Sequence, residues 1–262
     1  MKKISLILLS VLFSMLYSCE KVIDVNVKEI DSEIMIEGIV SDDPSEGAKV
    51  IITKSLSIGE TSEFPSVSGA TVIINDDLGN SFVLLESSAG SYTNSTLVGV
   101  PGRTYSLSIN VEGKIYTATS KMPTKVNLDA VNVDEITFPG IENGKSIVPV
   151  FTDPIGLGNY YRFKLKRNST ISKNIFLGDD QIIDGLTNSI GLIDQNMIHK
   201  SGDTAEVTLI CIDSHVYTYF YSMNQNLNGS TASPANPVTN IQGAKLGYFS
   251  AQASDTKFVI VP

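Results

Sequence analysis

The sequence predicts a mainly β fold: an N-terminal immunoglobulin-like β-sandwich over residues 33–123, then a second β-rich domain over residues 126–262 that carries one α-helix near residues 214–228. Three observations predict it. Apolar and polar residues alternate with a period of two along most of the chain, as in strands with one buried face. Turn-forming residues recur about every 8–12 residues, which is typical of a sandwich. A chain of 262 residues is also long enough for two domains of this kind.

The first 18 residues have the pattern of a bacterial lipoprotein signal peptide. Lys2 and Lys3 precede an apolar run over residues 4–16, which is too short to span a bilayer, and Cys19 follows directly on Ser18. This arrangement is similar to a lipobox, in which the cysteine is acylated with chains such as palmitate and becomes the new N-terminus. The alternative is an ordinary secretory signal with an incidental cysteine. We therefore expect lipidation at Cys19, membrane attachment through that lipid, and a polar tether over residues 19–32.

The predicted sandwich begins after the tether. Its clearest strand covers residues 103–111, where Tyr105, Leu107, Ile109 and Val111 alternate with polar residues. Glu112 and Gly113 then turn the chain into a partner strand over residues 114–120, which predicts a hairpin. Further strands are expected over residues 33–40, 49–54, 69–75, 81–86 and 90–95.

A proline marks the predicted domain boundary. Pro123 lies between two stretches of period two, and proline is excluded from central strands. The boundary is therefore placed at residues 122–125. Beyond it, strands are expected over residues 126–133, 146–151, 159–167, 205–212, 246–251 and 257–261.

The single predicted helix follows the strand over residues 205–212. Asp213 or Ser214 is suited to cap it, and Gly229 is suited to end it in the left-handed conformation. Its apolar residues recur at helical spacing, at Val216, Phe220, Met223 and Leu227. Tyr217, Tyr219 and Tyr221 lie beside or off this stripe. They are candidate contacts with a partner, or tyrosines packed at the edge of the core with their hydroxyl groups in water.

Charge and composition exclude several functions. The chain carries 28 acidic and 19 basic residues, a net charge of −9, and cleavage before Cys19 would remove two lysines and make it −11. This balance argues against a nucleic-acid-binding protein. Two histidines and two cysteines leave no room for a multi-ligand His/Cys metal site, and no cofactor-binding motif is present, so neither a metal nor a cofactor is expected.

The remaining polar clusters suggest structural roles. Asp179, Asp180 and Asp184 lack the spacing of a calcium-binding loop and are expected in a solvated acidic loop, with a loosely built calcium site as the alternative. His199, Asp213 and His215 lack a serine in a nucleophile motif, so we expect no enzymatic activity. Cys211 is expected to be a small buried residue, because it lies on the apolar face of its strand.

Five short segments together resemble a known family. Residues 69–72, 99–105 and 116–123 are similar to its first domain, and residues 234–238 and 247–251 to its C-terminal end. The family is catalogued as domain of unknown function 4249. Its members are lipoproteins of the Bacteroidetes type encoded near TonB-dependent outer-membrane receptors, and no catalytic residues are assigned in it.

The resemblance implies an accessory role, for binding or as a lid, at a TonB-dependent nutrient-uptake receptor. Lipid on Cys19 would then place the protein in the outer membrane, on either its periplasmic or its cell-surface face. The alternative is a structural or adhesive surface protein built on immunoglobulin-like modules. The sequence identifies no ligand.

Overall fold

The computed structural model describes residues 32–56, 63–138, 141–188, 190–227 and 235–262. The predicted signal peptide, Cys19, the tether up to residue 31 and Gly229 lie outside these residues. Within them the fold is mainly β, with one α-helix, α2 (Ser214–Leu227), as the sequence predicts. No helix among the described residues is long and apolar enough to cross a membrane.

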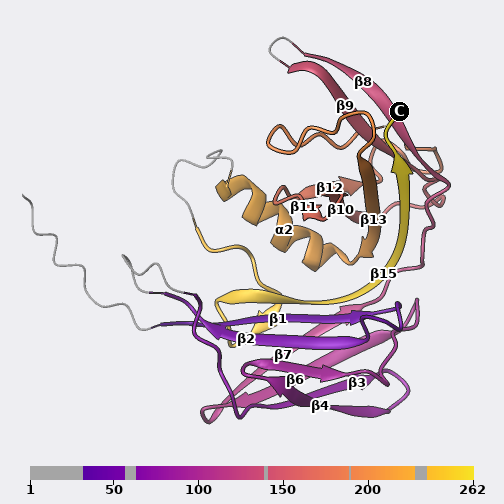
Figure 1. Cartoon of the computed structure of the whole chain (residues 1–262). Helices are drawn as coiled ribbons and strands as arrows, with labels where there is room; N and C mark the ends of the chain where they lie inside the picture. Colours follow the sequence, from indigo (N-terminus) through magenta and orange to yellow (C-terminus); the bar gives the residue numbers. More distant parts are fainter. Residues whose placement is uncertain (1–31, 57–62, 139–140, 189, 228–234) are drawn as a thin grey trace, which may run out of the picture. The chain divides into compact units, whose positions relative to one another are not determined.

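The N-terminal strands form two layers joined by a strand that belongs to both (Figure 1). β4 pairs with β3 through residues 81–84 and with β5 through residues 85–88. It therefore turns a corner between the layers, which is the usual way for one chain to build two packed sheets. The strands of this part are β1 (Ile34–Ser41), β2 (Ala48–Lys54), β3 (Thr71–Asp76), β4 (Ser81–Ser88), β5 (Ser91–Asn94), β6 (Thr104–Val111) and β7 (Lys114–Lys121).

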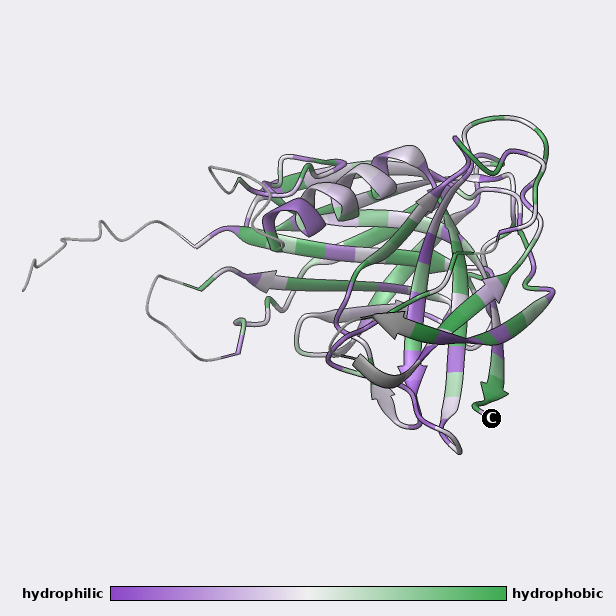
Figure 2. Ribbon diagram, turned by 90° about the horizontal axis from the view of Figure 1, so that it is seen from above, coloured by the Kyte–Doolittle hydropathy of each residue, from purple (hydrophilic) through white to green (hydrophobic). Residues whose placement is uncertain are grey.

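The predicted hairpin is confirmed as β6 and β7. Tyr105, Leu107, Ile109 and Val111 are all buried, and the polar residues between them face outward. Figure 2 shows the same alternation as bands of green and purple along the strands. Glu112 and Gly113 have φ values of 51° and 75°, the positive pair that a two-residue hairpin turn requires.

The second part is built around a sheet of β10 and β13 that α2 covers on one face. The helix buries Val216, Tyr219 and Phe220 against Ile210 and Tyr248 of the sheet. The guanidinium carbon of Arg162 lies 4.0 Å from the centre of the Phe220 ring, a cation–π contact. The strands of this part are β8 (Ala130–Phe138), β9 (Ile141–Val150), β10 (Tyr160–Arg167), β11 (Thr170–Ile171), β12 (Phe176–Asp179) and β13 (Thr204–Ile212). The short strand β14 (Ile241–Gln242) instead pairs with β7 and extends the N-terminal sheet.

The C-terminal strand connects both parts. β15 (Leu246–Ile260) pairs parallel to β1 through residues 246–252 and antiparallel to β13 through residues 253–260 (Figure 1). The sequence predicts two separate strands here, because polar residues interrupt the apolar alternation at residues 252–256. The interruption marks the point where one continuous strand passes from one partner to the other.

The segment between β7 and β8 is packed into a core that both parts share. Met122 is fully buried, the backbone N–H of Val126 donates to Cys211 Sγ at 3.4 Å, and that of Leu128 donates to Asp255 Oδ2 at 2.8 Å. One buried apolar cluster extends from Ile34 to Val261. The boundary at residues 122–125 lies between strands and stays a prediction.

Candidate functional site

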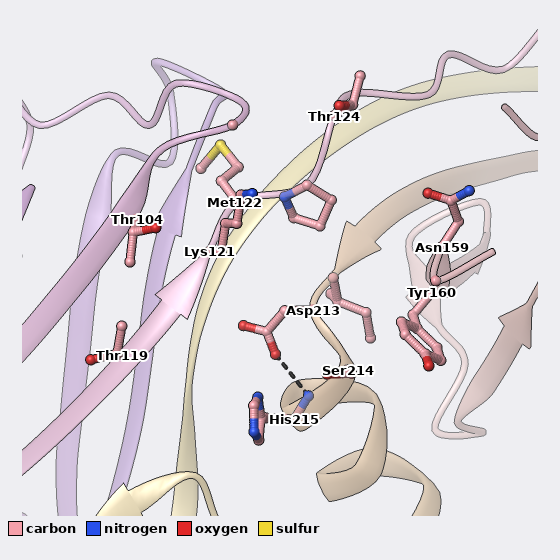
Figure 3. A pocket seen from close by; sticks show the side chains of 14 residues that line it. Thr104, Thr119, Lys121, Met122, Thr124, Asn159, Tyr160, Asp213, Ser214 and His215 are labelled. Atoms are coloured by element: carbon pink, nitrogen blue, oxygen red, sulfur yellow. Dashed lines mark hydrogen bonds between the residues drawn. The ribbon is translucent and has the colours of Figure 1, made fainter. Parts of the chain in front are cut away.

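A cavity of about 710 Å³ lies where the start of β6 and the end of β7 meet the start of β10 and of α2 (Figure 3). Its lining combines hydroxyl and amide groups with one carboxylate, one lysine and one imidazole. The lining residues are Gly102, Thr104, Thr119, Lys121, Met122, Pro123, Thr124, Gly158, Asn159, Tyr160, Ile212, Asp213, Ser214 and His215. They come from both parts of the chain, so the cavity exists only in the folded protein.

Asp213 is held in place from two sides. It lies between the end of β13 and the start of α2, where its Oδ1 accepts the backbone N–H groups of His215 and Val216, both at 2.9 Å. Its Oδ2 accepts the hydroxyl of Ser120 on β7, and the Ser120 oxygen accepts the N–H of Ala251 at 2.9 Å. The first pair of bonds is a helix N-cap, which confirms the capping role predicted for Asp213. The third ties α2 to the sandwich.

The three residues considered as a catalytic set are not brought together. Asp213 and His215 line the cavity, but His199 is buried elsewhere, beside the bridge that its backbone forms with Lys145. Burial lowers the pKa of the His199 imidazole, because the charged form loses its hydration. The Asp213 carboxylate already accepts hydrogen bonds from the helix N-terminus and from Ser120. The other polar side chains of the lining are therefore the groups that can bind a polar ligand.

The three helix tyrosines have different surroundings. The Tyr217 hydroxyl donates to Asp179 Oδ2 at 3.0 Å, and its ring lies 4.8 Å from that of Tyr160. Burial, and then the Asp179 carboxylate, raise the pKa of Tyr217 to about 12, so the hydroxyl stays a donor at neutral pH. Tyr221 is 49% exposed.

Tyr219 differs from its expected position off the buried stripe. It is only 6% exposed, and its ring lies 5.1 Å from that of Tyr248 on β15. Burial raises its pKa to about 12. The expectation is wrong because the rings of Tyr248 and Phe220 pack against the Tyr219 ring and bury it. The role of Tyr217, Tyr219 and Tyr221 as partner contacts stays a prediction.

The acidic segment over residues 179–184 differs from the expected solvated loop, because Asp180 is buried. Asp180 is 3% exposed, and its Oδ2 accepts the backbone N–H groups of Gly158 and Asn159 at 2.6 and 2.7 Å. A solvated role is therefore wrong for Asp180, because a buried carboxylate is stabilised by donors of this kind. Among the described residues, no group of three His, Cys, Asp or Glu side chains is placed to hold a metal ion.

Cys211 has the buried position expected of it. Its side chain is 1% exposed, and burial raises the pKa of the thiol to about 11, so it stays protonated and unreactive at neutral pH.

No sequence pattern predicts the second cavity, of about 220 Å³. Its floor is made by Phe151, Tyr161 and Phe163, and it lies under the segment over residues 182–192. Aliphatic residues in that segment have no periodic pattern, so they gave no signal of a shared surface. An apolar pocket of this kind is a default candidate for binding.

Three comparisons with known proteins bear on the chain. The family model described as "Domain of unknown function (DUF4249)" matches residues 20–257. No curated protein matches the chain. Among solved structures, the chain is similar to the selenomethionine-substituted interferon gamma receptor alpha chain of chicken, with 12% sequence identity and a TM-score of 0.22. The similarity covers 69% of this chain and 88% of that chain.

Proposed function

Because the chain belongs to the family described as Domain of unknown function (DUF4249), we propose that it is an outer-membrane-anchored lipoprotein, a non-enzymatic accessory subunit of a TonB-dependent nutrient-uptake receptor. The run that ends at Cys19 supports the anchor. The receptor follows from the family resemblance noted in the sequence. The subunit binds a ligand or acts as a lid over the receptor.

The observation that carries the binding role is the cavity of about 710 Å³. Thr104, Thr119, Thr124 and Asn159 provide neutral donors and acceptors, and Lys121 adds a cation. Binding sites of this size suit small molecules of the kind that uptake receptors carry. The Asp213 carboxylate serves as a helix cap and the cavity has no second carboxylate, which supports binding without chemistry.

The anchor is tested with Cys19→Ala in the native host. We expect the substituted protein to leave the membrane fraction and to lose labelling with radioactive palmitate, because acyl chains provide most of the affinity for the bilayer. Cys211→Ala is the matched control and should keep both properties. Membrane attachment that survives Cys19→Ala contradicts the anchor.

The accessory role is tested by affinity purification of the tagged lipoprotein from solubilised outer membranes, followed by mass spectrometry of proteins and of bound small molecules. We expect a TonB-dependent receptor among the recovered proteins. Thr119→Phe should narrow the cavity and reduce the bound small molecules, whereas Thr71→Phe, at an exposed threonine of β3 outside the cavity, should not. Recovery of neither a receptor nor a small molecule would reject the proposal in favour of a structural or adhesive role.

A further inference from the structure

The second cavity has the size and lining of a socket for one aromatic ring. Its volume is about 220 Å³, and an apolar cavity of about 150 Å³ already admits benzene. Phe151 and Tyr161 meet edge to face with their ring centres 5.0 Å apart, and Phe163 lies 6.0 Å from Phe151. The Tyr161 hydroxyl donates to Asp153, so the floor of the socket presents rings and not a free hydroxyl.

The rim of this socket is apolar and exposed. Ile182 and Ile190 line the cavity and are 75% and 59% exposed. The neighbouring loop over residues 154–159 carries Ile155 and Leu157, which are also exposed. Exposed aliphatic residues in such number beside a pocket are typical of an interaction surface.

Hydrogen bonds fix the two loops that carry these residues. Asp184 Oδ1 accepts the N–H of Gly156 at 2.6 Å, and Asp180 Oδ2 accepts those of Gly158 and Asn159. The apolar side chains are therefore held outward on an ordered backbone. A partner would lose little additional entropy on ordering this surface, which favours binding.

Charge selects the kind of partner. Residues 153–159 and 176–188 contain four aspartates and no lysine or arginine. Asp153 and Asp180 are buried, so Asp179 and Asp184 are the acidic groups that this surface presents. Asp179 lines the socket, where its carboxylate receives the Tyr217 hydroxyl and the N–H of Gln181, and further lone pairs stay open to a cation. This surface disfavours anionic lipid and anionic ligands and complements a basic partner.

We propose that this socket docks a protein segment that presents one aromatic side chain beside a lysine or arginine. The ring enters between Phe163, Ile182 and Ile190, and the cation meets Asp179 at the rim. The socket is separate from the polar cavity, so the proposal does not depend on a small-molecule ligand there. It adds a chemically defined partner surface to the chain.

The absence of tryptophan from the chain makes a direct test possible. The probe is a blocked pentapeptide with tryptophan at its centre and a lysine on either side. Its fluorescence should shift to the blue, saturably, when the indole enters the socket. The full chain carrying Cys19→Ala is used, so that no detergent competes for the apolar cavity.

Two variants and one control assign the binding site. Gly178 lines the socket, and a Cβ there would lie 3.5 Å from Phe163, an ordinary contact, so Gly178→Leu should fill the space and weaken binding at least tenfold. Ile182→Ser should weaken it several-fold without touching the core. Ile171→Ser, at another exposed isoleucine on β11 outside the socket, should leave it unchanged.

A second peptide, with glutamates in place of the lysines, tests the charge. It should bind at least tenfold more weakly, with the difference shrinking as salt is added. Equal binding of the two peptides, or unchanged binding to Ile182→Ser and to folded Gly178→Leu, overturns the proposal. So does a lack of saturable binding by either peptide. If the protein binds neither peptide but floats with phosphatidylcholine vesicles, and Ile182→Ser abolishes that flotation, the surface binds a membrane and the proposal is overturned. Receptor co-purification is measured separately, so either proposal can fail alone.

Discussion

Gly247 is where β15 passes closest to β1. It has a φ of +101°, and a Cβ built on it would lie 1.8 Å from the Ile36 carbonyl oxygen, whereas real Cβ contacts essentially never fall below 3.0 Å. Gly247→Ala must therefore separate the two strands by about 1 Å. The atoms that the Cβ would meet belong to the Ile36 backbone, which cannot relieve the overlap by changing a side-chain rotamer.

Two costs add up for Gly247→Ala. A positive φ costs a residue with a Cβ about 1–2 kcal/mol. Separation of the strands removes one or two ladder hydrogen bonds beside Ile36, each worth about 1 kcal/mol net. The free energy of unfolding should fall by about 2–4 kcal/mol, a large part of the roughly 5–15 kcal/mol typical of a native protein. The melting temperature should drop by about 4–16 °C in a chain of this size.

Gly79→Ala is the matched control. Gly79 lies in the turn between β3 and β4 with a φ of +87°, and a Cβ there meets nothing within 4 Å. Gly79→Ala should lower the free energy of unfolding only by the cost of the positive φ, about 1–2 kcal/mol. Urea denaturation followed by circular dichroism measures both variants. Equal losses for the two would show that β15 accommodates a side chain against β1, and would refute the reasoning.

Three further predictions concern the cap, the buried histidine and the domain boundary. Asp213→Ala should lower the free energy of unfolding by about 2–3 kcal/mol, because it removes the cap of α2 and the hydrogen bond from Ser120. Asp213→Asn should lower it clearly less, because asparagine is also a good N-cap residue. Equal losses for the two variants in urea denaturation would contradict a capping role. Burial lowers the pKa of His199 in the folded protein, so on acidification the unfolded chain protonates this imidazole at a higher pH than the folded protein does. The free energy of unfolding should therefore fall as pH drops below about 6.5. His199→Gln should flatten that slope in urea titrations, and identical slopes would sink the idea. A fragment of residues 33–123 should show no cooperative thermal transition, because β1 loses its pairing with β15; a sharp transition would instead support an independent first domain.

The elements that short-range pattern decides were predictable from the sequence. The β6–β7 hairpin is predicted by the alternation of apolar and polar residues and by the Glu112-Gly113 turn between the strands. α2 is predicted by the capping residue Asp213 and by apolar residues at helical spacing. The burial of Cys211 follows from the apolar face of its own strand. In each case the deciding interactions join residues close together in the chain, so the pattern is written locally.

Tertiary structure alone decided the rest. The pairing of β15 with both β1 and β13 depends on residues that are more than 40 positions apart, and no local pattern carries that information. Tyr219 is buried because Tyr248 lies beneath it, and Asp180 is buried because the backbone at Gly158 and Asn159 meets it. Both cavities are likewise assembled from distant segments. A surface made by distant segments has no sequence period, because its residues become neighbours only when the chain has folded.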